Sequence, residues 1–71
     1  MKAINLVIQT LKNHNMAFCR DIARTSGITE AEAICALLHL EQDGMTAQKN
    51  GYWWLTPTGE KFALKAALTK H

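Results

Sequence analysis

The chain has few of the features that mark specialised classes of protein. Its 71 residues include only two cysteines and one proline, with no internal repeat, no low-complexity segment and no long run of like charges. Because 48% of the residues are hydrophobic and 20% are charged, the composition indicates an ordered globular protein. A chain of this length is expected to form one domain, residues 1–71, that buries only about 60–65% of its unfolded surface. An enclosed catalytic cleft is therefore not expected.

The two cysteines lack the spacing that a metal site or a redox motif requires. Cys19 and Cys35 form no C-x-x-C pair, and no arrangement with His14 and His39 resembles a zinc pattern. This favours buried free thiols over a disulfide or a metal role, and we expect no metal and no cofactor. No Cys–His or Asp–Glu spacing indicates a nucleophile with an oriented base or a pair of catalytic carboxylates. We therefore expect that the protein is not an enzyme.

The chain also lacks a long apolar run and a strong charge of either sign. The apolar stretch over residues 4–8 is short and is interrupted by Asn5, with Gln9 directly after it, so a signal or membrane-spanning segment is not expected. We expect a cytoplasmic protein without membrane association. The net charge of +2 is too small to imply nucleic acid by itself. Any electrostatic argument must therefore depend on where the charges lie.

Two segments early in the chain have the pattern of short helices. Apolar residues recur at helical spacing over residues 2–13, which predicts a first helix. A second helix is expected over residues 19–25, with Ile22 and Ala23 facing inward and two arginines on its exposed side. Residues 16–18 are expected to be a plain linker between the two helices.

A third helix is marked by signals at both ends. Thr29 and Glu32 have the spacing of a capping box, which satisfies free N–H groups reciprocally at a helix start. Gly44 suits the position just after a helix end, so the helix is expected over about residues 30–43. Gly27 suits a turn residue with positive φ between the second and third helices. Together these signals predict a helix-turn-helix unit.

After the third helix the pattern changes to that of a β-hairpin. Residues 45–49 and 52–56 are short β-rich segments separated by Asn50-Gly51, the strongest two-residue hairpin signal. Alternation along the strands is expected to place Trp53 and Leu55 on one face with Met45 and Ala47. Tyr52 and Trp54 would then lie on the other face. Their rings either stay exposed, to stack on a base or anchor a partner, or pack against the first helix.

A last helix is expected from Pro57 to about residue 69. Thr56 suits its N-cap position and Pro57 its first residue. Basic residues recur along it, at Lys61, Lys65 and Lys70. These lysines form either an ordinary solvated surface or a phosphate-binding stripe.

The order of these elements and several short motifs carry a family resemblance over roughly residues 2–60. The motifs are Ile22-Ala23, Leu37-x-x-Leu40-Glu41-x-x-Gly44-Met45 and Leu55-Thr56-Pro57-Thr58-Gly59. With them the chain resembles winged helix-turn-helix domains of the broad MarR kind. It is most similar to the small PapI/FaeA fimbrial-switch regulators, which have a similar length and share the aromatic strand after the wing. The resemblance implies an α+β fold with a three-helix core, a two-stranded β-hairpin wing and a C-terminal helix.

The resemblance also implies a function. It predicts a small transcriptional regulator that binds double-stranded DNA with the third helix (about residues 30–43) and the wing (about 45–56), as a homodimer or beside a larger protein. A continuous positive surface is expected from the two arginines of the second helix across to the wing. The candidate DNA-binding residues are Arg20, Arg24, Thr29, Ala31, Cys35, His39, Lys49 and Asn50.

The outward face of the third helix departs from this family pattern. Its expected residues are Ala31, Glu32, Cys35, Leu38 and His39, and none is Arg, Lys, Asn or Gln, the types that chiefly read base edges. Acidic residues at its start either repel phosphates or only complement the helix dipole. The apolar residues here either pack beneath the first or last helix or form an exposed patch. Such a patch supports an alternative function, a winged-helix protein–protein interaction module acting as an adaptor or inhibitor.

Overall fold

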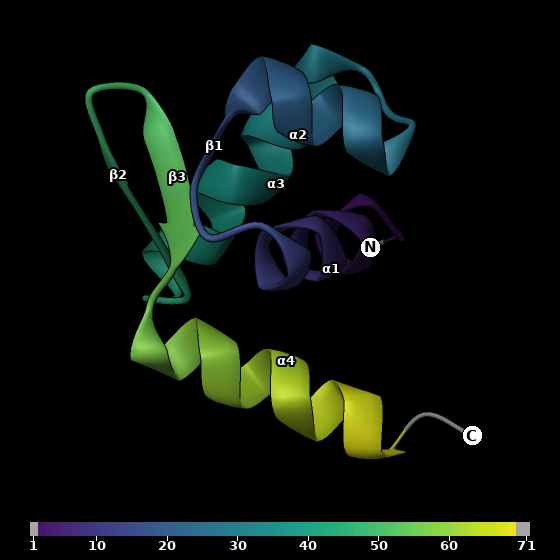
Figure 1. The fold of residues 1–71 in the computed structure, drawn as a ribbon, viewed down its shortest axis with the longest axis vertical. Coiled ribbons are helices and arrows are strands. Elements are labelled where there is room, and N and C mark those ends of the chain that lie inside the picture. Colours follow the sequence, from purple (N-terminus) through teal and green to yellow (C-terminus); the bar gives the residue numbers. More distant parts are fainter. Residues whose placement is uncertain (1, 70–71) are drawn as a thin grey trace.

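The computed structural model describes the backbone of residues 2–69 and the side chains of residues 3–64. Within this range the chain forms an α+β fold of four helices and one three-stranded antiparallel sheet (Figure 1). This confirms the α+β part of the predicted fold class. The elements in chain order are α1 (Lys2–Asn13), β1 (Ala17–Phe18), α2 (Cys19–Ser26), α3 (Glu30–Gln42), β2 (Thr46–Lys49), β3 (Tyr52–Leu55) and α4 (Pro57–Thr69).

The core lies where the first three helices meet. Val7 of α1, Ile22 of α2 and Leu37 of α3 are completely buried, so each helix contributes one side chain to its centre. Trp53 of β3 and Ala63 of α4 join the same apolar cluster. Figure 1 shows α1 between α2 and α4, with the sheet along one side of the helices. The sheet and α4 are therefore held to the helical body through buried apolar contacts.

The turn between α2 and α3 has the predicted chemistry. Gly27 adopts φ 73°, a left-handed conformation that costs other residues energy. The N–H of Ile28 then donates to the carbonyl oxygen of Ala23 at 3.0 Å, which closes the end of α2. The capping box of Thr29 and Glu32 is formed at the start of α3. These local signals fix the angle at which α3 leaves α2.

The sheet differs from the prediction in its number of strands. Residues 17 and 18, which we predicted as a linker, form β1 and pair with β3, so the strand order is β1-β3-β2. Ala17 lies opposite Trp53, and Phe18 lies opposite Tyr52. The two-stranded hairpin that we predicted is therefore a three-stranded sheet. Two residues are too few to show strand periodicity, and their pairing depends on a distant part of the chain.

The hairpin turn is the predicted one, but the predicted facing of β2 is wrong. Asn50 and Gly51 adopt φ 54° and 85°, as a two-residue hairpin turn with two positive φ angles requires. The register pairs Thr46 with Leu55 and Gln48 with Trp53. Residues opposite each other share a face, so the inward face of β2 carries positions 46 and 48 rather than 45 and 47. The hydroxyl of Thr46 is buried and donates to the carbonyl oxygen of Leu37 at 3.0 Å, which accounts for a polar residue on that face.

The start of α4 is capped as predicted. The N–H of Gly59 donates to the side-chain oxygen of Thr56 at 3.1 Å, and Pro57 is the first helical residue. The Thr56 hydroxyl in turn donates to the carbonyl oxygen of Gly44, just after α3. This ties the beginning of α4 to the end of α3. Lys61 is exposed, whereas the side chain of Lys65 and the whole of Lys70 lie outside the described residues, so the two alternatives for these lysines both stay open. Across the helices that the structure describes, none combines the length and the apolar character needed to cross a bilayer.

Candidate nucleic-acid interface

The outward face of α3 is open to solvent. Ala31, Cys35 and His39 are exposed along it, and Leu38 is 44% exposed. Ile34 instead packs against the core, so the apolar side chains of this face divide between core and surface. The buried side is formed by Ala33, Ala36, Leu37 and Leu40. The face that would meet a partner is therefore smooth and mostly apolar.

The start of α3 is occupied by its own cap. The N–H of Glu32 donates to the Thr29 hydroxyl oxygen at 3.1 Å, and the N–H of Thr29 donates to a Glu32 carboxylate oxygen at 3.0 Å. The Thr29 hydroxyl donates to the same carboxylate oxygen at 3.1 Å. The bonds from the Thr29 backbone and then its side chain hold the pKa of Glu32 below its usual range. Thr29 thus has no hydroxyl proton left for a phosphate, and Glu32 remains charged at this end of α3.

The two cysteines are free, but they differ in environment. Cys35 is exposed on α3, so the prediction that it is buried is wrong. Cys19, at the start of α2, is half-buried, and its thiol donates to the carbonyl oxygen of Glu30 at 3.7 Å. Burial, and then the charge of Glu30, raises the pKa of the Cys19 thiol. A thiol of this kind stays protonated and is a poor nucleophile and a poor metal ligand. No group of three or more His, Cys, Asp and Glu side chains that could hold a metal ion occurs among the described residues.

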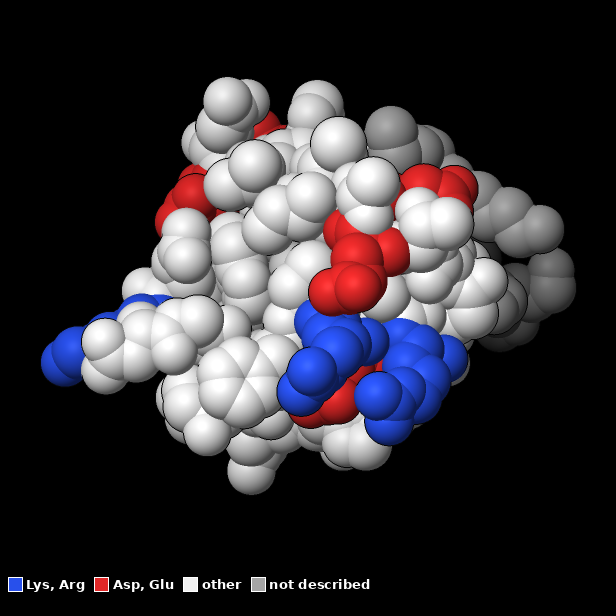
Figure 2. Space-filling view, turned by 90° about the horizontal axis from the view of Figure 1, so that it is seen from above, with Lys and Arg blue, Asp and Glu red and all other residues white. Residues whose placement is uncertain are grey.

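The predicted basic residues are exposed, but they do not form one surface. Arg20 and Arg24 are exposed on α2, and Lys49 and Asn50 are exposed at the hairpin turn. Figure 2 looks onto the side that carries α2 and the hairpin turn, and its basic side chains form two groups with uncharged surface between them. Acidic side chains adjoin the larger group. The prediction of a continuous positive surface is therefore wrong.

The hairpin itself carries no acidic residue, and the carboxylate nearest to it among the lining residues of a hollow at its turn is that of Glu30, on α3. No Asp or Glu occurs from Gly44 to Gly59, and Gln48, Lys49 and Asn50 are all exposed at the turn. By contrast, α2 carries Asp21 beside its arginines, and α3 begins with two glutamates. A phosphate that approaches the hairpin therefore meets a lysine and two amides without a neighbouring carboxylate in the sequence.

An aromatic pair lies beside the hairpin turn, and the sequence prediction identified only one of its two members. The rings of Phe18 and Tyr52 are stacked, with centroids 4.2 Å apart and planes at 28°. They are 39% and 41% exposed. Tyr52 was singled out from the sequence, but Phe18 lay in a presumed linker, and only the pairing of β1 with β3 brings the rings together. Trp54, the other aromatic residue of that strand face, is half-buried.

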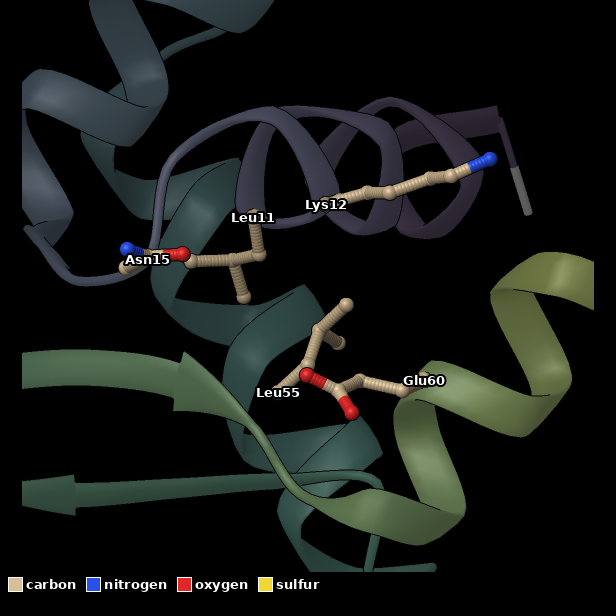
Figure 3. Close-up of a pocket in the computed structure, with 5 residues that line it drawn as sticks. All are labelled: Leu11, Lys12, Asn15, Leu55 and Glu60. Carbon is tan, nitrogen blue, oxygen red and sulfur yellow. The ribbon is translucent and has the colours of Figure 1, made fainter.

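A separate hollow of about 240 Å³ lies between α1 and the start of α4 (Figure 3). Leu11 and Leu55 point toward each other across it, while the amino group of Lys12 extends along α1 away from the carboxylate of Glu60. The charged groups of this hollow therefore do not converge on one point.

The chain matches no protein-family model and no curated protein. Its function must therefore be inferred from the arrangement and chemistry of its own residues.

Proposed function

We propose that the chain is a winged helix-turn-helix domain and that it acts in the cytoplasm as a small transcriptional regulator that binds double-stranded DNA. In this proposal α3 is the recognition helix and the β2–β3 hairpin is the wing. The observation that carries the proposal is a pairing of two features. The capped α2–turn–α3 unit leaves the outer face of α3 uncovered by any described residue, and beside it stands a hairpin whose turn carries Lys49 and Asn50 without a carboxylate.

The contacts divide into those that position the protein and those that face the bases. Arg20, Arg24 and Lys49 bind phosphates, and Asn50 supplies a neutral donor at the wing. On α3, Ala31 and Cys35 are small enough to let the helix backbone approach the groove closely. An alanine methyl group at this position contacts a thymine methyl group, which is an apolar form of base readout. The polar side chains of that face are Glu32, which caps the helix, and His39.

With these contacts, a single copy of the protein is expected to bind duplex DNA weakly, with a strong dependence on salt and little sequence preference. Few phosphates are neutralised, and the carboxylates of Glu30 and Glu32 lie at the start of the recognition helix. A second copy or a larger protein on the same DNA would add the phosphate contacts that one copy lacks. We therefore propose a homodimer or a complex with a larger protein as the form that occupies an operator.

Removing the proposed phosphate contacts is expected to flatten the salt dependence of duplex binding. Arg24→Ala and Lys49→Ala should each lower the slope of log affinity against log salt by about 0.9, because each phosphate contact releases counterions. Affinity should fall by a similar factor for unrelated duplex sequences. The measurement is a fluorescence anisotropy titration with a labelled nonspecific duplex, from low to moderate salt.

The matched control is Lys12→Ala, which removes the same charge from an exposed position at the end of α1. It should leave the slope unchanged. If the salt slope falls equally in Lys12→Ala, only the net charge of the protein matters. If the salt slope is unchanged in Lys49→Ala, the wing does not contact the duplex.

One observation favours a second candidate function, a protein–protein interaction module. The outer face of α3 exposes Leu38 beside Cys35 and presents none of the side chains that chiefly read base edges. If the folded protein does not bind duplex DNA even at low salt, the nucleic-acid proposal fails and this second candidate takes its place.

A further inference from the structure

We propose that the outer face of the sheet is a second binding surface, which stacks unpaired nucleobases of a single-stranded nucleic acid on Phe18 and Tyr52. This surface is distinct from α3. It needs no contact between α3 and a duplex, so it goes beyond the function proposed above.

The pairing of the strands builds the surface. Phe18 of β1 lies opposite Tyr52 of β3, and Tyr52 lies opposite Lys49 of β2, so the three side chains form one row across the sheet. Residues opposite each other in antiparallel strands share a face. Trp53, the next residue of β3, faces the other way and is buried in the core. The row therefore lies on the face of the sheet opposite the one that Trp53 buries in the core. It borders two helices, because residues of α1 and α2 line a hollow together with both rings.

The two stacked rings are partly exposed to solvent, whereas a stacked pair in a protein core would be buried. Each ring has one face against the other ring, and about two-fifths of each side chain remains exposed. Met16, which is 54% exposed, lines one open hollow of about 370 Å³ together with both rings. Three of the large exposed apolar side chains among the described residues thus gather at one place. Stacking on an aromatic ring is available to every base because each base has a flat π-face.

The charges around the row favour a phosphate at one end of it. Lys49 stands at the β2 end of the row, in a hairpin without acidic residues, and can meet a phosphate. Asp21 lines one hollow beside the rings, and Arg20 and Glu30 line another, which also reaches Gly51 of the hairpin turn. A strand whose bases stack on the rings therefore has its phosphates toward β2. Duplex DNA does not present base faces, so the row selects unpaired bases.

The test uses a fluorescein-labelled oligothymidylate of about ten nucleotides, a length within the range of known single-strand sites. Phe18→Leu and Tyr52→Leu keep an apolar side chain but remove the ring. Each should weaken binding by at least about fivefold at every salt concentration, because a stacked base contributes at least that much. Lys49→Ala should instead reduce the salt slope. Tyr52→Phe, which keeps the ring, should bind like the unaltered protein.

The matched control is Phe62→Leu, which removes a ring that is 40% exposed on α4. It should leave the affinity unchanged. A second measurement needs no substitution: the ring protons of Phe18 and Tyr52 in the unaltered protein should shift upfield in its NMR spectrum when the oligothymidylate is added. Circular dichroism shows whether each variant is folded. If a leucine variant is unfolded, the NMR titration of the unaltered protein tests the stacking instead.

The proposal is overturned if the oligothymidylate does not bind at low salt, if the folded leucine variants bind like the unaltered protein, or if Phe62→Leu weakens binding equally. An oligouridylate of the same length shows whether RNA is bound as well, and binding of either strand through the two rings supports the proposal. Loss of duplex binding with retained single-strand binding contradicts the function proposed above but leaves this inference intact.

Discussion

Replacing Gly59 with Ala is expected to destabilise the protein by about 2–3 kcal/mol. In an ordinary helix interior the same change is stabilising, by about 0.5–1 kcal/mol, because glycine loses more entropy on folding. At this position an added Cβ atom would lie 2.0 Å from the carbonyl oxygen of Met45 and 2.9 Å from its carbonyl carbon. That carbonyl oxygen also accepts from the N–H of Thr56 at 3.0 Å. The segment before β2 and the start of α4 must therefore separate to make room.

The measurement is urea unfolding followed by far-UV circular dichroism. Thr58→Ala is the matched control, because it changes an exposed side chain in the same turn of α4 and should alter the free energy of unfolding by no more than about 0.5 kcal/mol. If Gly59→Ala is as stable as the unaltered protein or more so, α4 does not dock against Met45 as described.

Replacing Trp53 with Ala is expected to remove about 3–5 kcal/mol of stability. Trp53 is 3% exposed, and its ring joins the sheet to the core formed by the three helices. A domain of this length has a total stability of about 4–11 kcal/mol. The variant should therefore lose a large fraction of its stability and unfold at a clearly lower temperature, and unfolding should remove the proposed interface.

Trp54→Ala is the control for Trp53, because it removes the same ring from the next residue of the same strand. Trp54 lies on the opposite face and is half-buried, so its loss should destabilise the protein by only about 1 kcal/mol. Thermal unfolding of the two variants gives the comparison. Equal losses would contradict the assignment of the inward face of β3.

The features predicted correctly from the sequence are those set by neighbouring residues. The Thr29–Glu32 capping box, the turn at Gly27 and the hairpin at Asn50-Gly51 each depend on chemistry within a few positions of the chain. The buried side of α3 followed from helical periodicity in the same way. These signals were enough to place all four helices and the hairpin.

The features that were missed depend on contacts between distant segments. β1 is a strand only because β3 pairs with it, and Phe18 becomes part of a surface only through that pairing. The close approach of Gly59 to Met45 has no local signature. The facing of β2 is a different case, because a two-residue turn at Asn50-Gly51 fixes the register, and counting back from it gives the correct faces.

The candidate site was predicted as a set of exposed residues, and the structure leaves those on α2, α3 and the hairpin exposed. Sequence periodicity could not show how the charges would be distributed around them. Uncharged surface separates the basic side chains into two groups, acidic side chains adjoin the larger group, and the cap at Thr29 uses the hydroxyl that was expected to contact DNA. The hairpin, with Lys49 and no acidic residue, is therefore the strongest part of the predicted interface.

The most direct test of the proposed duplex-binding site is NMR mapping of the unaltered protein. A ¹⁵N-labelled sample is titrated with a nonspecific duplex at low salt, and the backbone amide shifts are followed by residue. We predict that the largest changes fall on α3 from Ala31 to His39 and on the hairpin turn from Lys49 to Gly51, with little change in α1. Amide shifts confined to α1 and α4, or no amide shifts in the folded protein, would contradict the proposed duplex-binding site.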